Sequence, residues 1–372
     1  MSERQGVRSV KLVQLGLGGV GRALVRQVLQ NRERHARELG LRLEYAALAD
    51  RDGLVLAPEG LPDETLKRLV DAKAQGAKLK ALTDEGGRPG ALDPALLDEI
   101  DVDCGIVVDV TASEATAPLL LEAVERGWGA VLANKLPLAG PLDVFQKLTR
   151  TRRTRFETTV AAALPVISTL QGFLLDTGDR VWRIRGCVSG TLGLVCQRLE
   201  RGEPLSRIVE EARAHGHTEP DPREDLSGRD AARKALILAR LLGYPLELED
   251  VDREGLYPAE WDALSVEEFM TRLPERDAHY LKLSRDAKAQ GRTLRYVVEV
   301  AGGRARARLE ALPLDDELVR PGVADSVVAF YTERYGEAPL IVRGRGSGPE
   351  LTASGVLADV LVLASMDASM SV

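Results

Sequence analysis

An aspartate and a lysine share one face of a predicted helix in the second half of the chain. Asp230 and Lys234 stand at i and i+4 in residues 230–242, where apolar residues recur at helical spacing. The adjoining alanine and leucine stripe would shield Lys234 from part of the solvent. Burial lowers the pKa of a lysine and nearby carboxylates raise it, so such a lysine can serve as a general acid or base. The alternative is an ordinary surface ion pair, worth about 0.3–0.5 kcal/mol.

A glycine-rich turn near the start of the chain has the spacing of a dinucleotide-binding loop. The pattern G-x-G-x-x-G follows the apolar segment 10–15 and precedes a helical pattern over 22–30. Gly16 would allow a tight turn, Gly18 would let the backbone approach a pyrophosphate, and Gly21 would allow close packing of helix on strand. An ordinary glycine turn is the alternative. The loop residues expected to contact a dinucleotide are Gly16, Leu17, Gly18, Gly19, Val20 and Gly21.

Two residues of opposite charge end the second predicted strand, residues 43–49. Asp50 lies where a carboxylate accepts hydrogen bonds from the adenosine ribose hydroxyls of NAD, whereas Arg51 can neutralise the 2′-phosphate of NADP. These requirements conflict, so NAD or NADP remains open. Since the residue ending a strand usually faces the ribose, the pattern favours NAD with NADP tolerated.

The elements around these residues alternate in type along the first half of the chain. Strands are predicted at 10–15, 43–49, 104–110 and 129–133, and helices at 22–30, 62–73 and 115–126. Strands alternating with helices indicate right-handed βαβ units and a parallel sheet. Beyond residue 155 the predicted helices are 164–175, 192–200, 205–214 and 230–242, and the predicted strands are 181–188, 292–300, 304–312 and 327–331.

We therefore predict an α/β fold with a Rossmann dinucleotide-binding domain and a second α+β domain for catalysis and dimerisation. The first domain is placed at residues 1–152 and the second at 153–340. The C-terminal segment 341–372, with a helix at 353–363, is expected to return to the nucleotide-binding domain.

Composition argues against several classes of function and location. The net charge of −7 disfavours a general affinity for nucleic acid or for an anionic membrane. No apolar run approaches the ~20 residues that span a bilayer, and the N-terminus does not resemble a signal peptide, so a cytoplasmic protein is expected. Cys104, Cys187 and Cys196 show no CxxC pairing, which disfavours a disulfide framework and a cysteine-built zinc site.

The segment from Gly216 to Lys234 closely resembles the signature of homoserine dehydrogenase, roughly G-[YF]-x-E-x-D-P-x-x-D-[VL]-x-G-x-D-x-x-x-K. Every fixed position is filled except the aromatic one, where His217 stands. The resemblance extends over nearly the whole chain, because further segments follow in the family's order. These segments are the glycine motif, 110–113, 133–135, Glu157 with 163–167, 189–191, 344–348 and 351–359.

The resemblance implies reversible NAD(P)-dependent oxidation of L-homoserine to L-aspartate 4-semialdehyde, a step toward threonine, methionine and isoleucine. It implies that Lys234 transfers the proton at the reacting oxygen and that Glu219 and Asp230 hold the substrate, whose ammonium group suits carboxylates. Asp225 would orient the site or bind substrate directly. Lys135 would contact the nicotinamide ribose or share the proton transfer. Further cofactor contacts implied by the family are Thr111, Ala112, Lys135, Gly216 and Gly348, with a backbone turn as the alternative for each glycine.

The family can also hold a monovalent cation, usually sodium. The implied ligands are the Glu157 carboxylate and the main-chain oxygens of Val160, Ala162 and Leu164. Where the family commonly has glycine, this chain has Ala161 and Ala163, and alanine would strain the loop if either position needs a positive φ. A structural carboxylate without a cation is the alternative.

Two other functions compete with this interpretation. A phosphate-dependent aldehyde dehydrogenase needs a cysteine nucleophile beside a histidine, and none of the three cysteines heads a helix in a suitable loop. A catalytically silent NADP-binding redox sensor would lose Lys234, Glu219 or Asp230, all of which are present. The second predicted sheet suggests a homodimer, as in the family. Because the chain ends soon after its last predicted helix, neither a regulatory ACT domain nor a fused aspartate kinase domain is expected.

Overall fold

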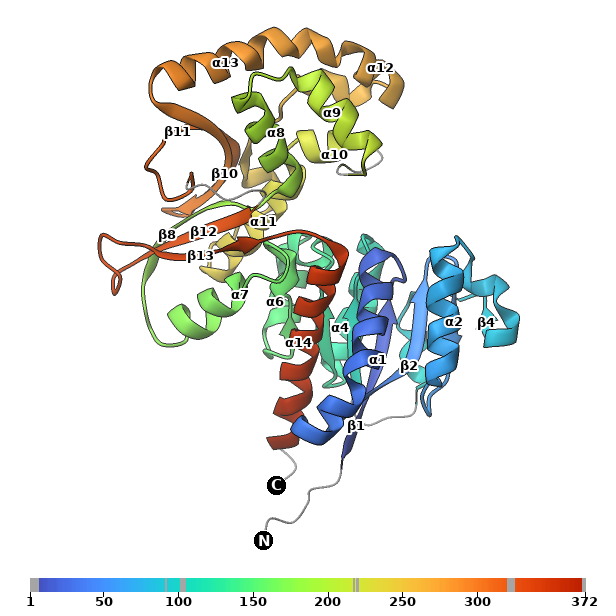
Figure 1. Ribbon diagram of the computed structural model, residues 1–372. Helices are drawn as coiled ribbons and strands as arrows, with labels where there is room; N and C mark the ends of the chain where they lie inside the picture. The colour runs from blue at the N-terminus through green and yellow to red at the C-terminus, as the bar shows by residue number, and fades with distance from the viewer. Residues whose placement is uncertain are drawn as a thin grey trace. The chain divides into compact units, whose positions relative to one another are not determined.

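The computed structural model describes residues 7–90, 92–100, 105–216, 218, 221–319 and 325–369. The chain divides into two compact units, of which the first contains Met1–Ala163 and Gly348–Val372 and the second contains Leu164–Ser347. The sequence-based boundaries at 152 and 340 lie somewhat earlier than these divisions. The mixed α/β class is confirmed, with a Rossmann-like first unit and a second unit built on its own sheet (Figure 1).

The first unit is organised by a seven-stranded sheet with the order β4-β3-β2-β1-β5-β6-β7. Strands β2, β1, β5, β6 and β7 are mutually parallel, so their carboxyl ends meet at one edge. That edge is where an open α/β sheet binds ligands. The strands are β1 Arg8–Leu15, β2 Leu41–Asp50, β3 Gly53–Leu56, β4 Gly87–Arg88, β5 Gly105–Asp109, β6 Gly129–Leu132 and β7 Thr154–Arg155.

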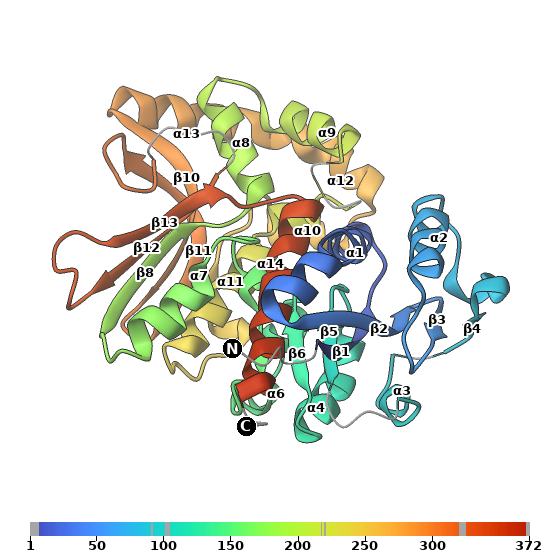
Figure 2. The same ribbon diagram turned by 60° about the horizontal axis from the view of Figure 1, so that its bottom comes forward.

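Helices cover both faces of this sheet. They are α1 Gly19–Leu39, α2 Asp63–Ala74, α3 Ala95–Asp98, α4 Ala117–Glu125, α5 Leu136–Ala139, α6 Leu142–Thr149 and α14 Pro349–Ser369. Helices α1 and α14 lie side by side although they come from opposite ends of the chain (Figures 1 and 2). Helix α14 thus belongs to the first unit, while residues 341–347 of the predicted C-terminal segment belong to the second.

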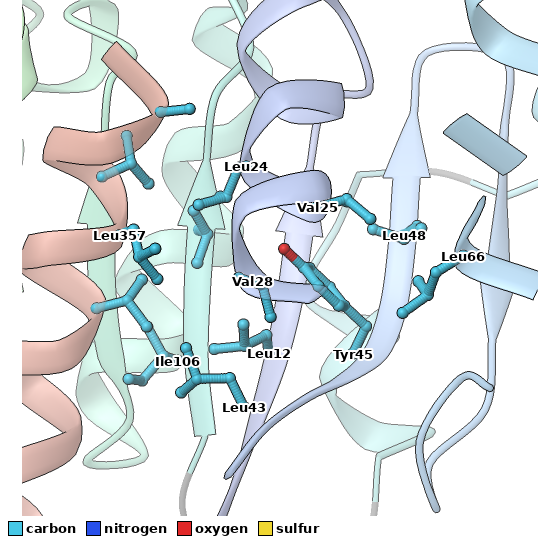
Figure 3. Close-up of a cluster of buried hydrophobic side chains, with 14 of the residues drawn as sticks. Leu12, Leu24, Val25, Val28, Leu43, Tyr45, Leu48, Leu66, Ile106 and Leu357 are labelled. Atoms are coloured by element: carbon cyan, nitrogen blue, oxygen red, sulfur yellow. The ribbon is translucent and has the colours of Figure 1, made fainter. Parts of the chain in front are cut away.

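The core of the first unit joins α1, the central strands and α14. Val28 of α1 lies beside Leu12 of β1, and Leu24 of α1 and Leu357 of α14 belong to the same buried cluster (Figure 3). Ile106 of β5 is fully buried in this cluster. Burying an aliphatic side chain of this size contributes roughly 1.5–3 kcal/mol, so α14 is an integral part of the first unit's core.

Helix α14 contains the one window among the described residues, Pro349–Met366, that is long and apolar enough to cross a membrane by length and composition. Its residues Val356 and Val360 are fully buried against the first unit, and Leu363 is 1% exposed. This pattern is typical of the core helix of a globular protein.

The second unit contains a six-stranded sheet with the order β13-β12-β8-β10-β11-β9. Its strands are β8 Val181–Cys187, β9 Asp252–Arg253, β10 Arg292–Ala301, β11 Arg304–Pro313, β12 Asp325–Thr332 and β13 Leu340–Arg345. Its helices are α7 Val166–Ser168, α8 Gly190–Glu200, α9 Leu205–Ala214, α10 Arg223–Leu226, α11 Arg229–Leu241, α12 Val266–Arg272 and α13 Asp277–Ala289. Thr169–Leu175 is a π-helix, where the sequence predicts an ordinary α-helix over 164–175.

The two faces of the second sheet differ in character. Tyr296 of β10 packs against the Gly228 turn that precedes α11, and the side chains that alternate with it, including Glu299, lie on the other face of the sheet. On that other face Arg183 donates from Nε to Glu299 Oε1 at 3.0 Å, and Arg306 also pairs with Glu299. The face that carries Glu299 therefore holds these two ion pairs.

Candidate functional site

The glycine loop between β1 and α1 has the backbone geometry that its sequence predicts. Gly16 has a φ of +102°, and a Cβ there would lie 2.9 Å from the carbonyl oxygen of Val110. A Cβ at Gly21 would lie 2.2 Å from the Gly16 carbonyl oxygen. The backbone of α1 therefore packs directly against the backbone of the loop, with no room for a side chain at residue 21. At Gly18, by contrast, an added Cβ would meet no described atom within 4 Å. Among the four glycines of this loop, Gly18 is the one with open space beside its backbone.

The side chain of a buried glutamine, Gln14, forms hydrogen bonds with the backbone of this loop. Gln14 of β1 is fully buried and donates from Nε2 to the carbonyl oxygens of Gly16, at 2.9 Å, and Gly21, at 3.1 Å. Gln14 was not predicted from the sequence, although a polar residue inside an otherwise apolar strand is a signal of such a role. Leu17 is buried, so its side chain packs in the core and its contact with a cofactor would be through the backbone. Gly19 and Val20 begin α1, whose N-terminus attracts anions.

Asp50, at the end of β2, forms an ion pair that sequence spacing did not predict. Lys73, near the end of α2, places Nζ 2.7 Å from Asp50 Oδ2, with side-chain exposures of 13% and 11%. Asp50 Oδ1 accepts a hydrogen bond from the backbone N–H of Asp52 at 2.8 Å. The adjacent Arg51 is exposed. The Lys73 ammonium thus lies beside the Asp50 carboxylate, and Arg51 follows Asp50 in the chain.

Thr111, Ala112 and Lys135 lie at the carboxyl ends of β5 and β6, where the sequence predicts them. Thr111 donates from its N–H to Asp109 Oδ1 at 2.9 Å, and Ala112 is exposed. Lys135 precedes α5 directly and is half-buried. Asp109 and Asn134, which join these segments, were not singled out as functional by the sequence analysis. Both are buried polar residues at strand ends, and that combination was the available signal.

In the second unit, Lys234 is held between two acceptors. Its Nζ lies 2.6 Å from Asp230 Oδ2, one helical turn earlier in α11, and donates to the Val188 carbonyl oxygen at 2.6 Å. The Lys234 side chain is 12% exposed, against 34% for Asp230. The ammonium group is therefore mostly shielded yet fixed in direction. A surface ion pair would be more exposed to solvent and would not need the second acceptor, the Val188 carbonyl oxygen.

The neighbouring signature residues are described only in part. Asp225 lies in α10 and is half-buried, and Gly216 has a φ of +68° just after α9. Glu219 and His217 lie outside the described residues. Gly348 has a φ of +113°, and its carbonyl oxygen accepts the N–H of Thr352 in the first turn of α14. Both glycines have a positive φ, which residues with a side chain seldom adopt, so the backbone conformation alone explains glycine at these two positions.

The loop after Glu157 is strained at two alanines. Ala161 has a φ of +61° and Ala162 a φ of +51°, a region that side-chain-bearing residues seldom adopt. Strain was predicted at Ala161 or Ala163, but the left-handed pair is Ala161 and Ala162, and Ala163 is not among the residues with positive φ. The backbone N–H of Glu157 donates to Asp359 Oδ2 at 2.9 Å, and Val160 is fully buried. The carbonyl oxygen of Leu164 accepts the N–H of Val166.

Asp359, which accepts the Glu157 N–H, has a raised pKa. Burial raises the pKa of Asp359 to about 7, and the nearby Glu157 charge adds to the shift. Among the described residues there is no group of three or more histidine, cysteine or acidic side chains that could hold a metal ion. Any cation at the Glu157 loop would thus depend on main-chain oxygens in addition to the carboxylate.

The two described cysteines, Cys187 and Cys196, are buried thiols with raised pKa values. Burial raises the pKa of both the Cys187 and the Cys196 thiols to about 12. Cys187 lies in β8 and Cys196 in α8, and both carry free thiols. Cys104 lies outside the described residues. Neither of the two described thiols suits a thioester-forming nucleophile, which reacts as the thiolate.

Comparison with known proteins identifies both units. Residues 165–361 match the sequence model of homoserine dehydrogenase, and residues 16–158 match that of the homoserine dehydrogenase NAD binding domain. A homoserine dehydrogenase of Emericella nidulans is 34% identical over 371 residues, covering 93% of this chain and 96% of the relative. A hyperthermophilic archaeal homoserine dehydrogenase, solved in complex with NADPH, superposes with a TM-score of 0.76 at 25% identity over 96% of this chain and 98% of that one.

Longer relatives match as well. A bifunctional aspartokinase/homoserine dehydrogenase of Haemophilus influenzae is 35% identical over 358 residues, which is 95% of this chain and 42% of the relative. The chain thus spans less than half the length of the bifunctional relatives that it matches. The two family matches, which together run through both units, and the full-length fungal relative lead to one conclusion: the chain belongs to the homoserine dehydrogenase family.

Proposed function

We propose that this protein catalyses the reversible NAD(P)-dependent oxidation of L-homoserine to L-aspartate 4-semialdehyde. The observation that carries the proposal is the fixed position of Lys234, between Asp230 Oδ2 and the Val188 carbonyl oxygen. An alcohol oxidation needs a group that takes the hydroxyl proton, and a lysine aligned by two acceptors is suited to this task. The bound nicotinamide supplies the hydride acceptor.

The remaining roles follow from charge and position. Lys234 takes the proton from the reacting hydroxyl in the forward direction and returns it in reverse. Asp230 and Glu219 bind the substrate ammonium group, and Asp225 orients this group or contacts the substrate itself. Lys135 acts from the first unit, either on the nicotinamide ribose or in the proton transfer.

A substitution pair tests this proposal. Lys234→Ala is expected to lower turnover at least 10²-fold, because a positioned general acid or base contributes 10²–10⁴-fold. Binding of the cofactor is expected to change little. The matched control is Lys282→Ala on α13, which removes another lysine whose aspartate partner, Asp286, lies 2.6 Å away at i+4. That lysine is 73% exposed and should be dispensable.

The assay follows the reduced nicotinamide by absorbance with homoserine and either cofactor. Turnover in the wild type that is lost in Lys234→Ala and kept in Lys282→Ala supports the proposal. Retention of more than a tenth of turnover in Lys234→Ala refutes the role of Lys234. A wild type that binds NADPH yet oxidises no homoserine would instead favour the silent redox sensor.

We further propose that NADP is accepted at least as well as NAD. The sequence alone favoured NAD, because a carboxylate at Asp50 repels a 2′-phosphate. The Lys73 ammonium, 2.7 Å from that carboxylate, offsets this repulsion, and the exposed Arg51 adds a second positive charge. At ~4 Å, two unit charges interact by about 4 kcal/mol at an effective dielectric constant of 20, so one such cation is enough to change the preference.

A monovalent cation such as sodium is proposed at the Glu157 loop. The donor set of one carboxylate and the carbonyl oxygens of Val160, Ala162 and Leu164 contains oxygen alone, which suits a hard cation. Such a cation would stabilise the loop between β7 and α7. Thermal unfolding in sodium chloride, compared with tetramethylammonium chloride at equal ionic strength, tests this proposal. A higher Tm in sodium is expected, and equal values would contradict it.

We propose a homodimer joined through the second sheet, and a cytoplasmic location. The support for the dimer is the sheet face that carries Glu299, which pairs with Arg183 and Arg306, together with Trp182, which is 47% exposed beside Tyr331. The support for the location is the packing of the apolar α14 inside the first unit. Sedimentation velocity should give a dimer mass, and a monomer at micromolar concentration would refute it. Cell fractionation tests the location.

A further inference from the structure

Asp109, the last residue of β5, is a fully buried carboxylate at the ligand-binding edge of the first unit. Its Oδ1 accepts hydrogen bonds from the Thr111 N–H and hydroxyl, at 2.9 and 2.7 Å. Its Oδ2 accepts from the Thr116 hydroxyl at 2.7 Å and from Asn134 Nδ2 at 3.0 Å. A carboxylate only accepts hydrogen bonds, and every described partner here donates one.

The Asn134 side chain links the Asp109 carboxylate to the segment that carries Lys135 through hydrogen bonds. Asn134 Nδ2 donates to the Ser113 carbonyl oxygen at 2.7 Å as well as to Asp109, and it also lies 3.2 Å from Thr111 Oγ1 and 3.4 Å from Thr116 Oγ1. Asn134 Oδ1 accepts the N–H of Leu136 at 3.1 Å, at the start of α5. These contacts fix which way the amide points. Lys135 therefore lies between two residues that the network holds in place.

The main chain of Asp109 holds the same segment. The Asp109 carbonyl oxygen accepts the N–H groups of Ala133, at 2.9 Å, and Asn134, at 3.2 Å. Burial raises the pKa of the Asp109 carboxyl, and the hydrogen bonds from Thr116, Thr111 and Asn134 oppose that rise. Side chain and backbone of one residue thus connect the ends of β5 and β6.

We propose that Asp109 is a positioning residue for the dehydrogenase reaction, which sets the position of Lys135 through Asn134 and that of Thr111 directly. The inference rests on the proposed function, because that function gives Lys135 and Thr111 their work at the cofactor. Asp109 itself is fully buried and acts only through these neighbours.

The substitution Asp109→Asn disturbs this network without changing its size. An asparagine offers one oxygen and one NH₂ group to two sets of donors. In one orientation its NH₂ faces Asn134 Nδ2, which is a donor; in the other it faces the Thr111 N–H. Asn134 cannot compensate by turning its amide, because Oδ1 is needed by Leu136 and Nδ2 by Ser113. In the first orientation the Asn134 N–H keeps only its longer contacts, with Thr111 Oγ1 at 3.2 Å and Thr116 Oγ1 at 3.4 Å, and in the second the Thr111 N–H loses its acceptor.

Thr116→Val is the matched control. It removes a hydrogen bond to Asp109 Oδ2 and the longest contact of Asn134 Nδ2, at 3.4 Å, but its hydroxyl comes from the turn before α4 and the shorter Asn134–Asp109 hydrogen bond stays in place. The experiment measures Tm, the stoichiometry and affinity of NADPH by fluorescence titration, and kcat and KM for homoserine at saturating cofactor. Asn134→Ala breaks the same link while leaving Asp109 its threonine donors, and it serves if Asp109→Asn does not fold.

We expect Asp109→Asn and Asn134→Ala to lower kcat at least tenfold, with the NADPH stoichiometry per chain unchanged and KM for homoserine within threefold. Thr116→Val should change kcat less than threefold even if its Tm falls. If kcat and NADPH stoichiometry fall in proportion, the role is structural and the proposal is overturned. It is equally overturned if folded Asp109→Asn keeps kcat within threefold. A wild type without homoserine turnover would instead refute the proposed function.

Discussion

Lys73 and Asp50 form an ion pair across the end of the second strand, with 2.7 Å between Nζ and Oδ2. The two residues come from α2 and β2 and are each nearly nine-tenths shielded from solvent. The pair brings a positive charge to the strand end that is expected to face the adenosine ribose. It changes the electrostatic argument on cofactor choice, because the carboxylate is no longer an isolated negative charge.

The first prediction concerns this pair. Lys73→Ala should lower kcat/KM for NADP at least tenfold and leave kcat/KM for NAD within threefold, because the freed Asp50 carboxylate repels only the phosphorylated ribose. Lys67→Ala is the control, since Lys67 lies on the same helix, is 56% exposed and pairs with Glu64. Steady-state kinetics with both cofactors checks this. Equal losses for the two cofactors would show that Lys73 supports the fold and does not select the cofactor.

Two substitutions in the glycine loop should have different effects, one on cofactor binding and the other on folding. Gly18→Ala should fold normally, because its φ is −72° and no described atom would meet the new methyl group. Its affinity for NADPH should fall at least tenfold if the pyrophosphate passes close to this backbone. Gly21→Ala should fail to fold or lose much stability, since its Cβ would lie 2.2 Å from the Gly16 carbonyl oxygen. Circular dichroism melts and fluorescence titration separate the two effects, and normal NADPH binding by Gly18→Ala would contradict the close approach.

The strained loop after Glu157 predicts a gain in stability. Ala162→Gly should raise the free energy of unfolding by about 0.5–1 kcal/mol, because a left-handed alanine costs ~1–2 kcal/mol and the entropy of glycine returns ~0.5–1 kcal/mol of that. Ala161→Gly should be nearly neutral, since Ala161 is 1% exposed and loses a buried methyl group worth ~0.8 kcal/mol. Ala163→Gly, without positive φ, should destabilise. Denaturant titrations of the three variants should give that order, and a destabilised Ala162→Gly would count against strain at this position.

The thiols predict resistance to alkylation. With pKa values of about 12, Cys187 and Cys196 carry little thiolate at pH 8 and should react about 10³-fold more slowly than in the unfolded chain. The experiment uses a Cys104→Ser background, iodoacetamide, and mass spectrometry with and without urea. Turnover should survive the native treatment. Rapid alkylation with matching loss of turnover would revive a thioester mechanism.

The sequence predicted much of the first unit because its signals are local. The strand before Gly16, the glycine spacing and the helix after it constrain one another within a few residues, and the structure has them in that order. The helix face shared by Asp230 and Lys234 is also a local property, and the structure pairs the two side chains. Whether these residues do the chemistry assigned to them stays a prediction.

The features that the sequence did not predict depend on distant contacts. Lys73 meets Asp50 only because α2 packs beside β2, and no spacing rule reveals that pairing. Strand β13 and helices α12 and α13 were missed because their patterns are weak. The strand is stabilised by its pairing with β12, which depends on tertiary structure. The left-handed pair falls at Ala161 and Ala162, and not at Ala163, because loop geometry over several residues decides which one turns.

Helix α14 gives the first unit a discontinuous core, and this affects the order in which the protein can fold during synthesis. The β1–α1 region needs Val356, Val360 and Leu363 to cover its apolar side, but these residues leave the ribosome only after the entire second unit. Until then the nascent first unit presents an uncovered hydrophobic surface, a state prone to aggregation and to capture by chaperones. The second unit, whose residues are continuous in the chain, can complete its own sheet first. The N-terminal nucleotide-binding unit would thus be the last to become fully stable.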